Sequence, residues 1–136
     1  MNLSDYSEGL IATWLAGGAA PSQLTTLFLD VHSASPGESN SNNNSVYQQL
    51  TGISGRKSIT PVSSSFSATG SNVTNSAEIL LTLSAVAACT ITHFSIWTAS
   101  TGGSQIYNGA ITGSPISILV GNRVSFAIGS IQIIVA

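Results

Sequence analysis

Side chains that could bind a metal ion gather around one short segment of the sequence. Asp30 and His32 stand two positions apart, so both would lie on one face of a strand. His93 or Glu38 could complete a set of imidazole and carboxylate ligands. In the competing interpretation, Asp30 and His32 lie where a strand leaves the core, and His93 is half-buried and bonded to backbone. We favour this second interpretation and expect no metal and no other cofactor.

The other groups that catalysis requires lack their usual sequence context. Serine is abundant, yet no Gly-x-Ser-x-Gly motif occurs, and the two histidines fit no pattern that predicts a Ser/His/Asp triad. None of the five carboxylates forms a distinguished pair for acid–base chemistry. Gly17-Gly18 and Gly102-Gly103 belong to no phosphate-binding motif and are typical of turns and helix ends. We therefore expect no catalytic residues and a protein that is not an enzyme.

Charge is nearly absent from the chain. Only 6% of its 136 residues are charged, against about a quarter in an ordinary globular protein. Neutral Ser, Thr and Asn side chains cost less to bury at an interface than lysine or glutamate does. Such a surface suits a subunit of an assembly better than a free monomer. Three cations are too few for a nucleic-acid partner, and no apolar run is long enough to span a membrane.

The elements that must position these residues are one helix and a series of short strands. Leu3, Tyr6, Leu10 and Trp14 recur at three- and four-residue steps, which predicts a helix within residues 1–18 that Ser4 caps. Strand-forming runs then occur at 24–31, 57–62, 77–83, 89–98, 105–112, 114–120, 123–128 and 131–135, and a further short strand begins at 46–47. We expect an exposed loop at 38–45 and an irregular connection at 63–76.

Short strands at this spacing predict an all-β fold. We expect a single domain over 1–136, in which the helix at 1–18 precedes an antiparallel, jelly-roll-like β-sandwich of about eight strands at 24–136. Gly121-Asn122 and Gly129-Ser130 are expected to close hairpins between the last three strands. Either the sandwich itself or a neighbouring subunit must cover the apolar face of the helix.

Three aromatic residues offer an alternative role in sugar binding. Trp14, Trp97 and Tyr107 could line a carbohydrate-binding surface on a small β-sandwich. Trp97 lies within the most apolar strand, however, and Trp14 lies on the apolar face of the helix. We therefore favour packing in the core or against another subunit for these side chains.

A set of motifs in the second half of the chain forms a recurrent pattern. It comprises a strand with Thr92-His93-Phe94, the Gly102-Gly103 turn, a strand with Gly109-Ala110, and the segment 120–126 before an apolar last strand. Upstream, 27–29 followed by 35–38 also fits. This pattern resembles the small virion proteins of tailed phages, which are described as capsid cement (decoration) proteins with jelly-roll folds or as tail-fibre-associated proteins.

The resemblance implies a structural protein of the virion. Our first hypothesis is a capsid cement protein on the capsid exterior, which forms a dimer or trimer with itself and stabilises the shell of the major capsid protein. The alternatives are a tail-fibre or baseplate structural component and a carbohydrate-binding module for host attachment. The candidates for partner contacts lie on the helix and in the polar loop: Leu3, Tyr6, Leu10, Trp14, Asn40, Asn42, Asn43 and Asn44.

Overall fold

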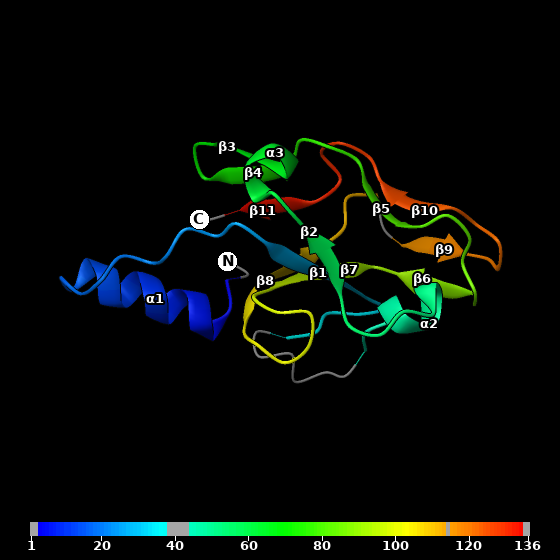
Figure 1. Cartoon of the computed structure of the whole chain (residues 1–136), viewed down its shortest axis with the longest axis horizontal. Coiled ribbons are helices and arrows are strands. Elements are labelled where there is room, and N and C mark those ends of the chain that lie inside the picture. Colours follow the sequence, from blue (N-terminus) through cyan, green and yellow to red (C-terminus); the bar gives the residue numbers. More distant parts are fainter. Residues whose placement is uncertain (1–2, 38–43, 114, 135–136) are drawn as a thin grey trace.

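The computed structural model describes residues 3–37, 44–113 and 115–134, and within these ranges the chain is mostly β (Figure 1). The helices are α1 (Asp5–Leu15), α2 (Tyr47–Thr51) and α3 (Val62–Ser65). The strands are β1 (Leu27–His32), β2 (Lys57–Ile59), β3 (Phe66–Thr69), β4 (Asn72–Asn75), β5 (Ile79–Thr82), β6 (Cys89–Ile91), β7 (His93–Trp97), β8 (Gln105–Ala110), β9 (Ile116–Ile118), β10 (Val124–Phe126) and β11 (Gln132–Ile134).

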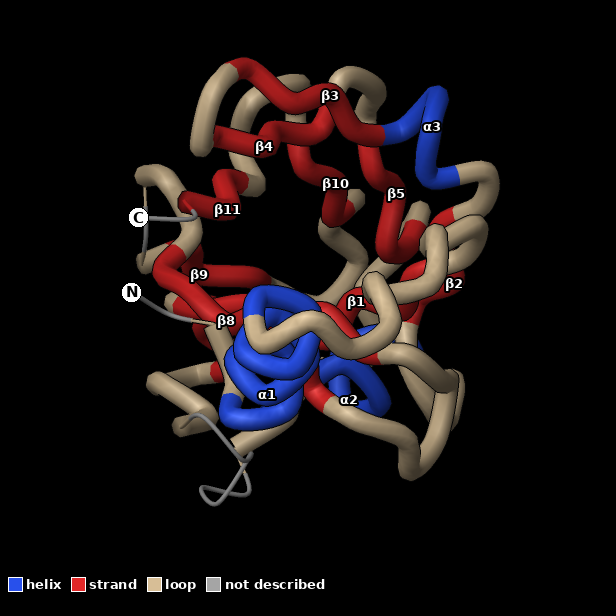
Figure 2. Tube along the Cα trace, turned by 90° about the vertical axis from the view of Figure 1, so that its left-hand side faces the viewer, coloured by secondary structure: helices blue, strands red, loops and turns tan. Residues whose placement is uncertain are grey.

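Antiparallel sheets in two layers form the body of the protein, which confirms the predicted all-β sandwich. The largest sheet has the strand order β2-β1-β7-β8, and the others are β11-β4-β3, β10-β5 and β6-β9. Figure 2 shows β3, β4, β5, β10 and β11 arched over β1, β2, β8 and β9. Apolar side chains from both layers fill the space between them.

The centre of the core lies where β1 pairs with β7. Leu29 stands opposite Ile96, and Val31 stands opposite Phe94, and all four side chains are buried. On the neighbouring strand β8, Gly109 leaves room for aromatic rings, because a Cβ there would lie 3.3 Å from the Phe94 ring. A side chain at position 109 would therefore require the rings of Phe94 and Tyr107 to shift by a few tenths of an ångström.

Helix α1 begins and ends as predicted. Ser4 accepts a hydrogen bond from the Ser7 amide at 3.2 Å, and Gly17 at φ 90° follows the last turn. The start of α1 is fastened to β8: the Ser4 amide donates to the Ile106 carbonyl at 3.1 Å, and the Ser7 hydroxyl donates to the same oxygen at 2.7 Å. These bonds give hydrogen-bond donors to the Ile106 carbonyl on β8, the outermost strand of the four-stranded sheet.

Two local predictions were wrong, because two β-prone residues were taken for a strand at 46–47 and neutral polar residues give a weak signal at 63–76. The segment at 46–47 opens helix α2 rather than a strand, and Gly52 in the left-handed conformation (φ 73°) ends that helix. The stretch at 63–76 is not irregular: it contains α3 and then β3 and β4, joined by a turn at Gly70. Its Ser, Thr and Asn side chains adopt strands here because β11 supplies a third strand.

The predicted hairpins between the last three strands are also wrong. Turns do occur at 119–122 and 127–130, with the Asn122 amide bonded to the Leu119 carbonyl and the Ser130 amide to the Ala127 carbonyl. However, β9 pairs with β6, β10 with β5, and β11 with β4. The chain enters a different sheet after each turn, which a local turn signal cannot reveal.

Candidate assembly surface

Helix α1 carries an exposed apolar stripe. Tyr6, Leu10 and Trp14 follow one another at four-residue steps and therefore lie on one side of the helix, with Trp14 52% exposed. Leu15, at the end of the helix, is also exposed. We call Tyr6, Leu10, Trp14 and Leu15 the helix ridge.

The ridge is exposed because α1 contacts the body only near its beginning. Ser7 is the one buried residue among those of α1, and Ile11 is partly buried against the core. Figure 1 shows α1 extending from one end of the molecule, beyond the strands. Of the two covers expected for this apolar face, the sandwich does not supply one within the described part of the chain, and a neighbouring subunit stays a prediction.

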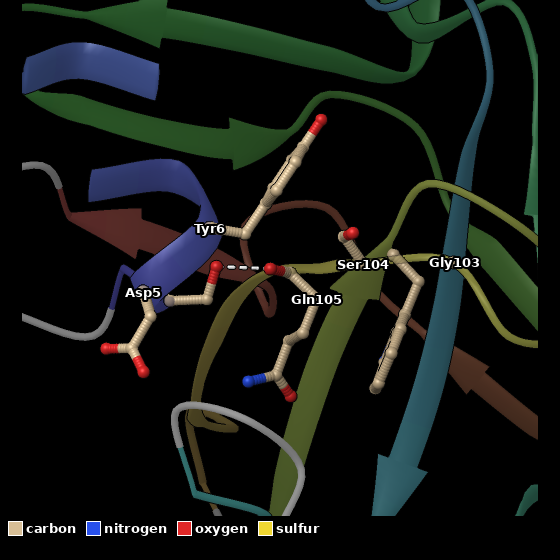
Figure 3. A pocket seen from close by; sticks show the side chains of 7 residues that line it. Asp5, Tyr6, Gly103, Ser104 and Gln105 are labelled. Carbon is tan, nitrogen blue, oxygen red and sulfur yellow. Dashed lines mark hydrogen bonds between the residues drawn. The ribbon is translucent and has the colours of Figure 1, made fainter. Parts of the chain in front are cut away.

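The base of α1 borders a shallow hollow of about 200 Å³. Figure 3 shows Asp5 and Tyr6 from α1 on one side of it, and Gly103, Ser104 and Gln105 on the other. Ser4 closes the floor by donating its hydroxyl to the Gln105 carbonyl. The Tyr6 ring points away from Gln105 and adds to the exposed ridge. The hollow can accept one side chain of a partner, which extends the candidate surface to the first turn of α1.

The other predicted contact residues have different positions. Leu3 was expected on the contact face, but it is 6% exposed and lies in the core of its own domain, where it bridges to Tyr107. Asn44 accepts a hydrogen bond from His32 and donates to the Ser35 carbonyl at 3.0 Å, so its amide holds its own loop. Asn40, Asn42 and Asn43 lie outside the described residues.

A second cluster of polar groups is buried beneath the four-stranded sheet. His32 and Ser95 are both 0% exposed. The Trp97 indole N–H donates to the Ser95 oxygen at 2.7 Å, and Ser95 lies 2.7 Å from His32 Nε2. His32 Nδ1 lies 2.9 Å from Asn44 Oδ1. Because Asn44 Oδ1 can only accept, Nδ1 carries the proton of a neutral ring and Nε2 accepts from Ser95. Burial lowers the pKa of His32, and the nearby Asp30 carboxylate only partly opposes this effect.

Arg56 completes this cluster, and no sequence motif predicted its role there. Its guanidinium lies 3.7 Å from the centre of the Trp97 ring, and its Nε lies 3.8 Å from Asp30 Oδ2. It also donates to the Ala99 carbonyl at 2.8 Å and the Gly102 carbonyl at 2.9 Å. Burial lowers the pKa of Arg56 and the Asp30 carboxylate opposes that effect. The only available hint was that Arg56 is one of three cations in the chain.

The geometry of this cluster suits a structural clamp and not a catalytic relay. Asp30 Oδ2 and Ser95 both face Nε2 of His32, whereas a triad needs the carboxylate at Nδ1. Asp30 instead accepts from the Val31 amide at 2.9 Å and the Ser45 hydroxyl at 2.7 Å. Complete burial of Ser95 and His32 leaves a substrate no access to either. The cluster ties β1 and β7 to the loops at 44–45 and 99–102.

Of the residues considered as metal ligands, Glu38 lies outside the described residues, and Asp30, His32 and His93 are not placed together as a set of ligands. Among the described residues, no group of three or more His, Cys, Asp or Glu is placed to hold a metal ion. Asp30 and His32 were expected where a strand leaves the core, but both are buried within the sheet. His93 is half-buried as expected, yet its Nδ1 bonds the Thr92 hydroxyl at 2.8 Å rather than backbone.

The proposed sugar-binding aromatics are mostly internal. Trp97 is 6% exposed, and Tyr107 is 4% exposed, with its ring packed against Phe94 at 5.8 Å. The Tyr107 hydroxyl accepts a hydrogen bond from the Ile134 amide at 3.3 Å. Core packing, the favoured interpretation, is correct for both residues, and Trp14 alone of the three is exposed.

A weakly charged β-sandwich with an apolar helix extending from one end has the features of a structural subunit of a larger assembly. The family model described as "Podophage GP4 fiber I protein gp80" matches residues 2–134. The chain belongs to this family and is a structural protein of the phage virion. No curated protein sequence matches the chain. In the part of the chain that the structure describes, no helix has both the length and the apolar character to cross a membrane.

Proposed function

We propose that the chain is a fibre-associated structural subunit of the virion and that helix α1 attaches it to a neighbouring subunit. The observation that carries this proposal is the exposed helix ridge. It lies on a helix that is attached to the sandwich only near its first turn. The family description, which names a fibre protein, supports this location. We further propose that the role is not enzymatic, given that His32 and Ser95 are enclosed.

The energetics of the ridge favour docking. Burying a leucine or aromatic side chain contributes about 1.5–3 kcal/mol, so several ridge residues together are sufficient for a specific contact. The face brings little desolvation cost, because the charged residues of α1 are confined to its first turn, at Asp5 and Glu8. Aromatic anchors such as Trp14 and Tyr6 are typical of residues that dominate binding energy.

Capsid cement is the second candidate, with the major capsid protein and further copies of the chain as partners. The weakly charged surface favours it, because neutral groups can be buried over a wide area against a shell. Immunogold labelling of virions separates the candidates: label at the tail supports the fibre role, and label over the whole shell supports cement. A carbohydrate-binding role remains a third proposal, and binding to a glycan array would support it.

The test of the proposed function is incorporation into virions. Phage are produced with the ridge variant Leu10→Ser/Trp14→Ser and with the control Ala12→Ser, which adds a serine to the opposite, exposed side of α1. We expect at least a tenfold loss of the ridge variant from virions, measured by quantitative mass spectrometry, and normal levels of the control. Normal incorporation of a ridge variant with an unchanged circular dichroism spectrum would overturn the proposal.

A further inference from the structure

The turn that joins β7 to β8 lies between the polar cluster around Trp97 and the base of α1. We call residues 98–104 the β7–β8 turn. The Thr98 amide donates to the Ser104 carbonyl at 3.1 Å, and the Ser104 amide donates to the Thr98 hydroxyl at 2.9 Å. Gly103 adopts φ +69°, and a Cβ there would lie 2.8 Å from both Ala99 Cβ and Thr98 Oγ1. The turn is therefore closely packed and depends on a glycine at position 103.

Arg56 bonds to two carbonyls of the β7–β8 turn. Its Nη1 donates to the Ala99 carbonyl at 2.8 Å and to the Gly102 carbonyl at 2.9 Å. The guanidinium is itself held in place by the polar cluster described above. Gly55 also lies against the turn, because a Cβ there would lie 3.2 Å from the Ser100 carbonyl oxygen. The Arg56 side chain is only 12% exposed, so water has little access to replace its bonds to the turn.

The residues that follow the β7–β8 turn support α1. The first of them is Gln105, whose carbonyl accepts the Ser4 hydroxyl. The next carbonyl, that of Ile106, accepts the Ser4 amide at 3.1 Å and the Ser7 hydroxyl at 2.7 Å. Figure 3 shows the end of the β7–β8 turn and the base of α1 on opposite sides of one hollow. The turn and the helix base are therefore direct neighbours, and a shift of one displaces the other.

We propose that Arg56 is a positioning residue for the helix ridge: by fixing the β7–β8 turn, it sets the direction in which α1 leaves the sandwich. The path runs from Arg56 to the carbonyls of Ala99 and Gly102, along the turn to the first two residues of β8, and from their carbonyls to the start of α1. The purpose of this direction, which is to present the ridge to a neighbouring subunit, rests on the proposed function.

The shape of α1 amplifies small changes at its base. The helix has 11 residues and is about 16 Å long, and only its beginning is attached to the sandwich. A tilt of about 20° at the base would therefore displace the far end, at Leu15, by about 5 Å, which is close to the pitch of one helical turn. A turn that is loosened by the loss of two hydrogen bonds is sufficient to misdirect the ridge.

Distances between two spin labels, measured by pulsed EPR, report the direction of α1. The labels are attached through Ala12→Cys on α1 and Ala68→Cys on β3, both at exposed positions, in a Cys89→Ala background. Arg56→Lys keeps a positive charge near the cluster but lacks the planar group that bonds to both carbonyls. We expect it to widen the distance distribution at least about twofold or to shift its mean by about 5 Å or more.

A second variant and two controls separate positioning from a general loss of stability. Gly103→Ala disturbs the β7–β8 turn directly and should change the distances in the same way as Arg56→Lys. Ile118→Val removes part of a buried side chain in β9, at the end of the molecule away from α1 (Figure 1), and should keep the distances of the parent. Arg123→Lys makes the same exchange at an exposed ion pair and should also leave them unchanged.

Unchanged distances in both Arg56→Lys and Gly103→Ala overturn the inference, and so does an equal change in Ile118→Val. Should Gly103→Ala fail to fold, Thr98→Val replaces it, because this variant removes the hydrogen bond between the Thr98 hydroxyl and the Ser104 amide.

Incorporation into virions then relates the direction of α1 to assembly. Without spin labels, we expect Arg56→Lys to be lost from virions about fivefold or more, measured by quantitative mass spectrometry. If Arg56→Lys changes the distances but enters virions normally while the ridge variant Leu10→Ser/Trp14→Ser is lost, α1 takes up its direction only on docking and the inference is overturned. If the distances change as expected but the ridge variant enters virions normally, the inference about direction stands and the proposed function fails.

Discussion

His32 shows how one side chain can make the stability of this fold depend on pH. Its ring is enclosed between Ser95 and Asn44, in an arrangement that requires the neutral form. Protonation would turn Nε2 into a donor, so the Ser95 hydroxyl, which also accepts the Trp97 N–H, would lose Nε2 as the acceptor of its own proton. Asp30 offers some compensation at 3.9 Å, while Arg56 and His93 oppose the added charge. The net effect of these surroundings is to lower the pKa of His32.

We predict that the free energy of unfolding falls as the pH drops below about 6.5. The unfolded chain takes up a proton at its ordinary pKa, whereas folded His32 resists protonation, so acid favours unfolding by at most about 1.4 kcal/mol per pH unit. Urea unfolding between pH 7.5 and 5 measures this slope. His32→Gln should be less stable at pH 7.5 and have a shallower slope than the wild type. Equal slopes in His32→Gln and the wild type would contradict the assignment.

Arg56 should tolerate lysine poorly. A lysine cannot lie flat on Trp97 and reach Asp30 and two carbonyls at once, so we expect Arg56→Lys to cost about 1–2 kcal/mol. Arg123→Lys is the matched control, because Arg123 forms an exposed ion pair, and it should change stability by less than about 0.5 kcal/mol. Chemical denaturation of both variants provides the comparison, and equal losses would show that Arg56 has no special role.

At the scale of elements, Asn75 holds one end of the sandwich together. Its side-chain NH₂ donates to the Ala77 and Ala127 carbonyls, both at 2.9 Å, and its Oδ1 accepts from the Ile131 amide at 3.0 Å. One fully buried side chain therefore joins the end of β4 to the turns on either side of it.

We expect Asn75→Ala to cost about 3 kcal/mol or more, because it leaves three backbone groups without their partner in a buried place. Asn72→Ala, on the exposed first residue of the same strand, should cost less than about 0.5 kcal/mol. Thermal and urea unfolding measure both. A cost below about 1 kcal/mol for Asn75→Ala would mean that water replaces the amide.

The elements that the sequence predicts well are those with strong periodicity. The apolar steps from Tyr6 to Trp14 and the Ser4 cap predicted α1, and the apolar runs predicted β1, β5, β7 and β8 to within a few residues. The β3–β4 hairpin was missed, because its side chains are neutral and mostly exposed and leave no alternation to detect. The split of the 89–98 run into β6 and β7 was also missed, because the two strands pair in different sheets.

The contact residues were only partly predictable for a similar reason. The spacing identified Tyr6, Leu10 and Trp14 as one face, but it could not show that Leu3 turns into the core beside β8. The exposed apolar residues of three loops had no sequence signal, because these loops meet only after folding: Ile53, Leu83, Val86, Leu119 and Val120. Asn44 was predicted to contact a partner protein, because the sequence around it does not indicate that its side chain bonds to His32.

The whole molecule has a low density of charge, from which we expect its folding to depend little on ionic strength. Three cations and five carboxylates leave few long-range interactions for salt to screen. We predict that the midpoint of thermal unfolding changes by less than about 2 °C between 50 and 500 mM NaCl, measured by differential scanning calorimetry. A large downward shift would show that the Asp30–Arg56 and Glu78–Arg123 pairs contribute more than their geometry indicates.

Because α1 is attached only at its base, its length and its rotation about the helix axis determine where the exposed ridge lies relative to the sandwich. Its 11 residues measure about 16 Å, and each residue sets both an axial distance and an azimuth. Inserting one residue after the first turn would rotate the rest of the ridge by about 100°, whereas inserting seven would lengthen the helix by about 10 Å and nearly restore its direction. In the proposed attachment, α1 would set the spacing and the rotation between the chain and its neighbour, independently of the sandwich.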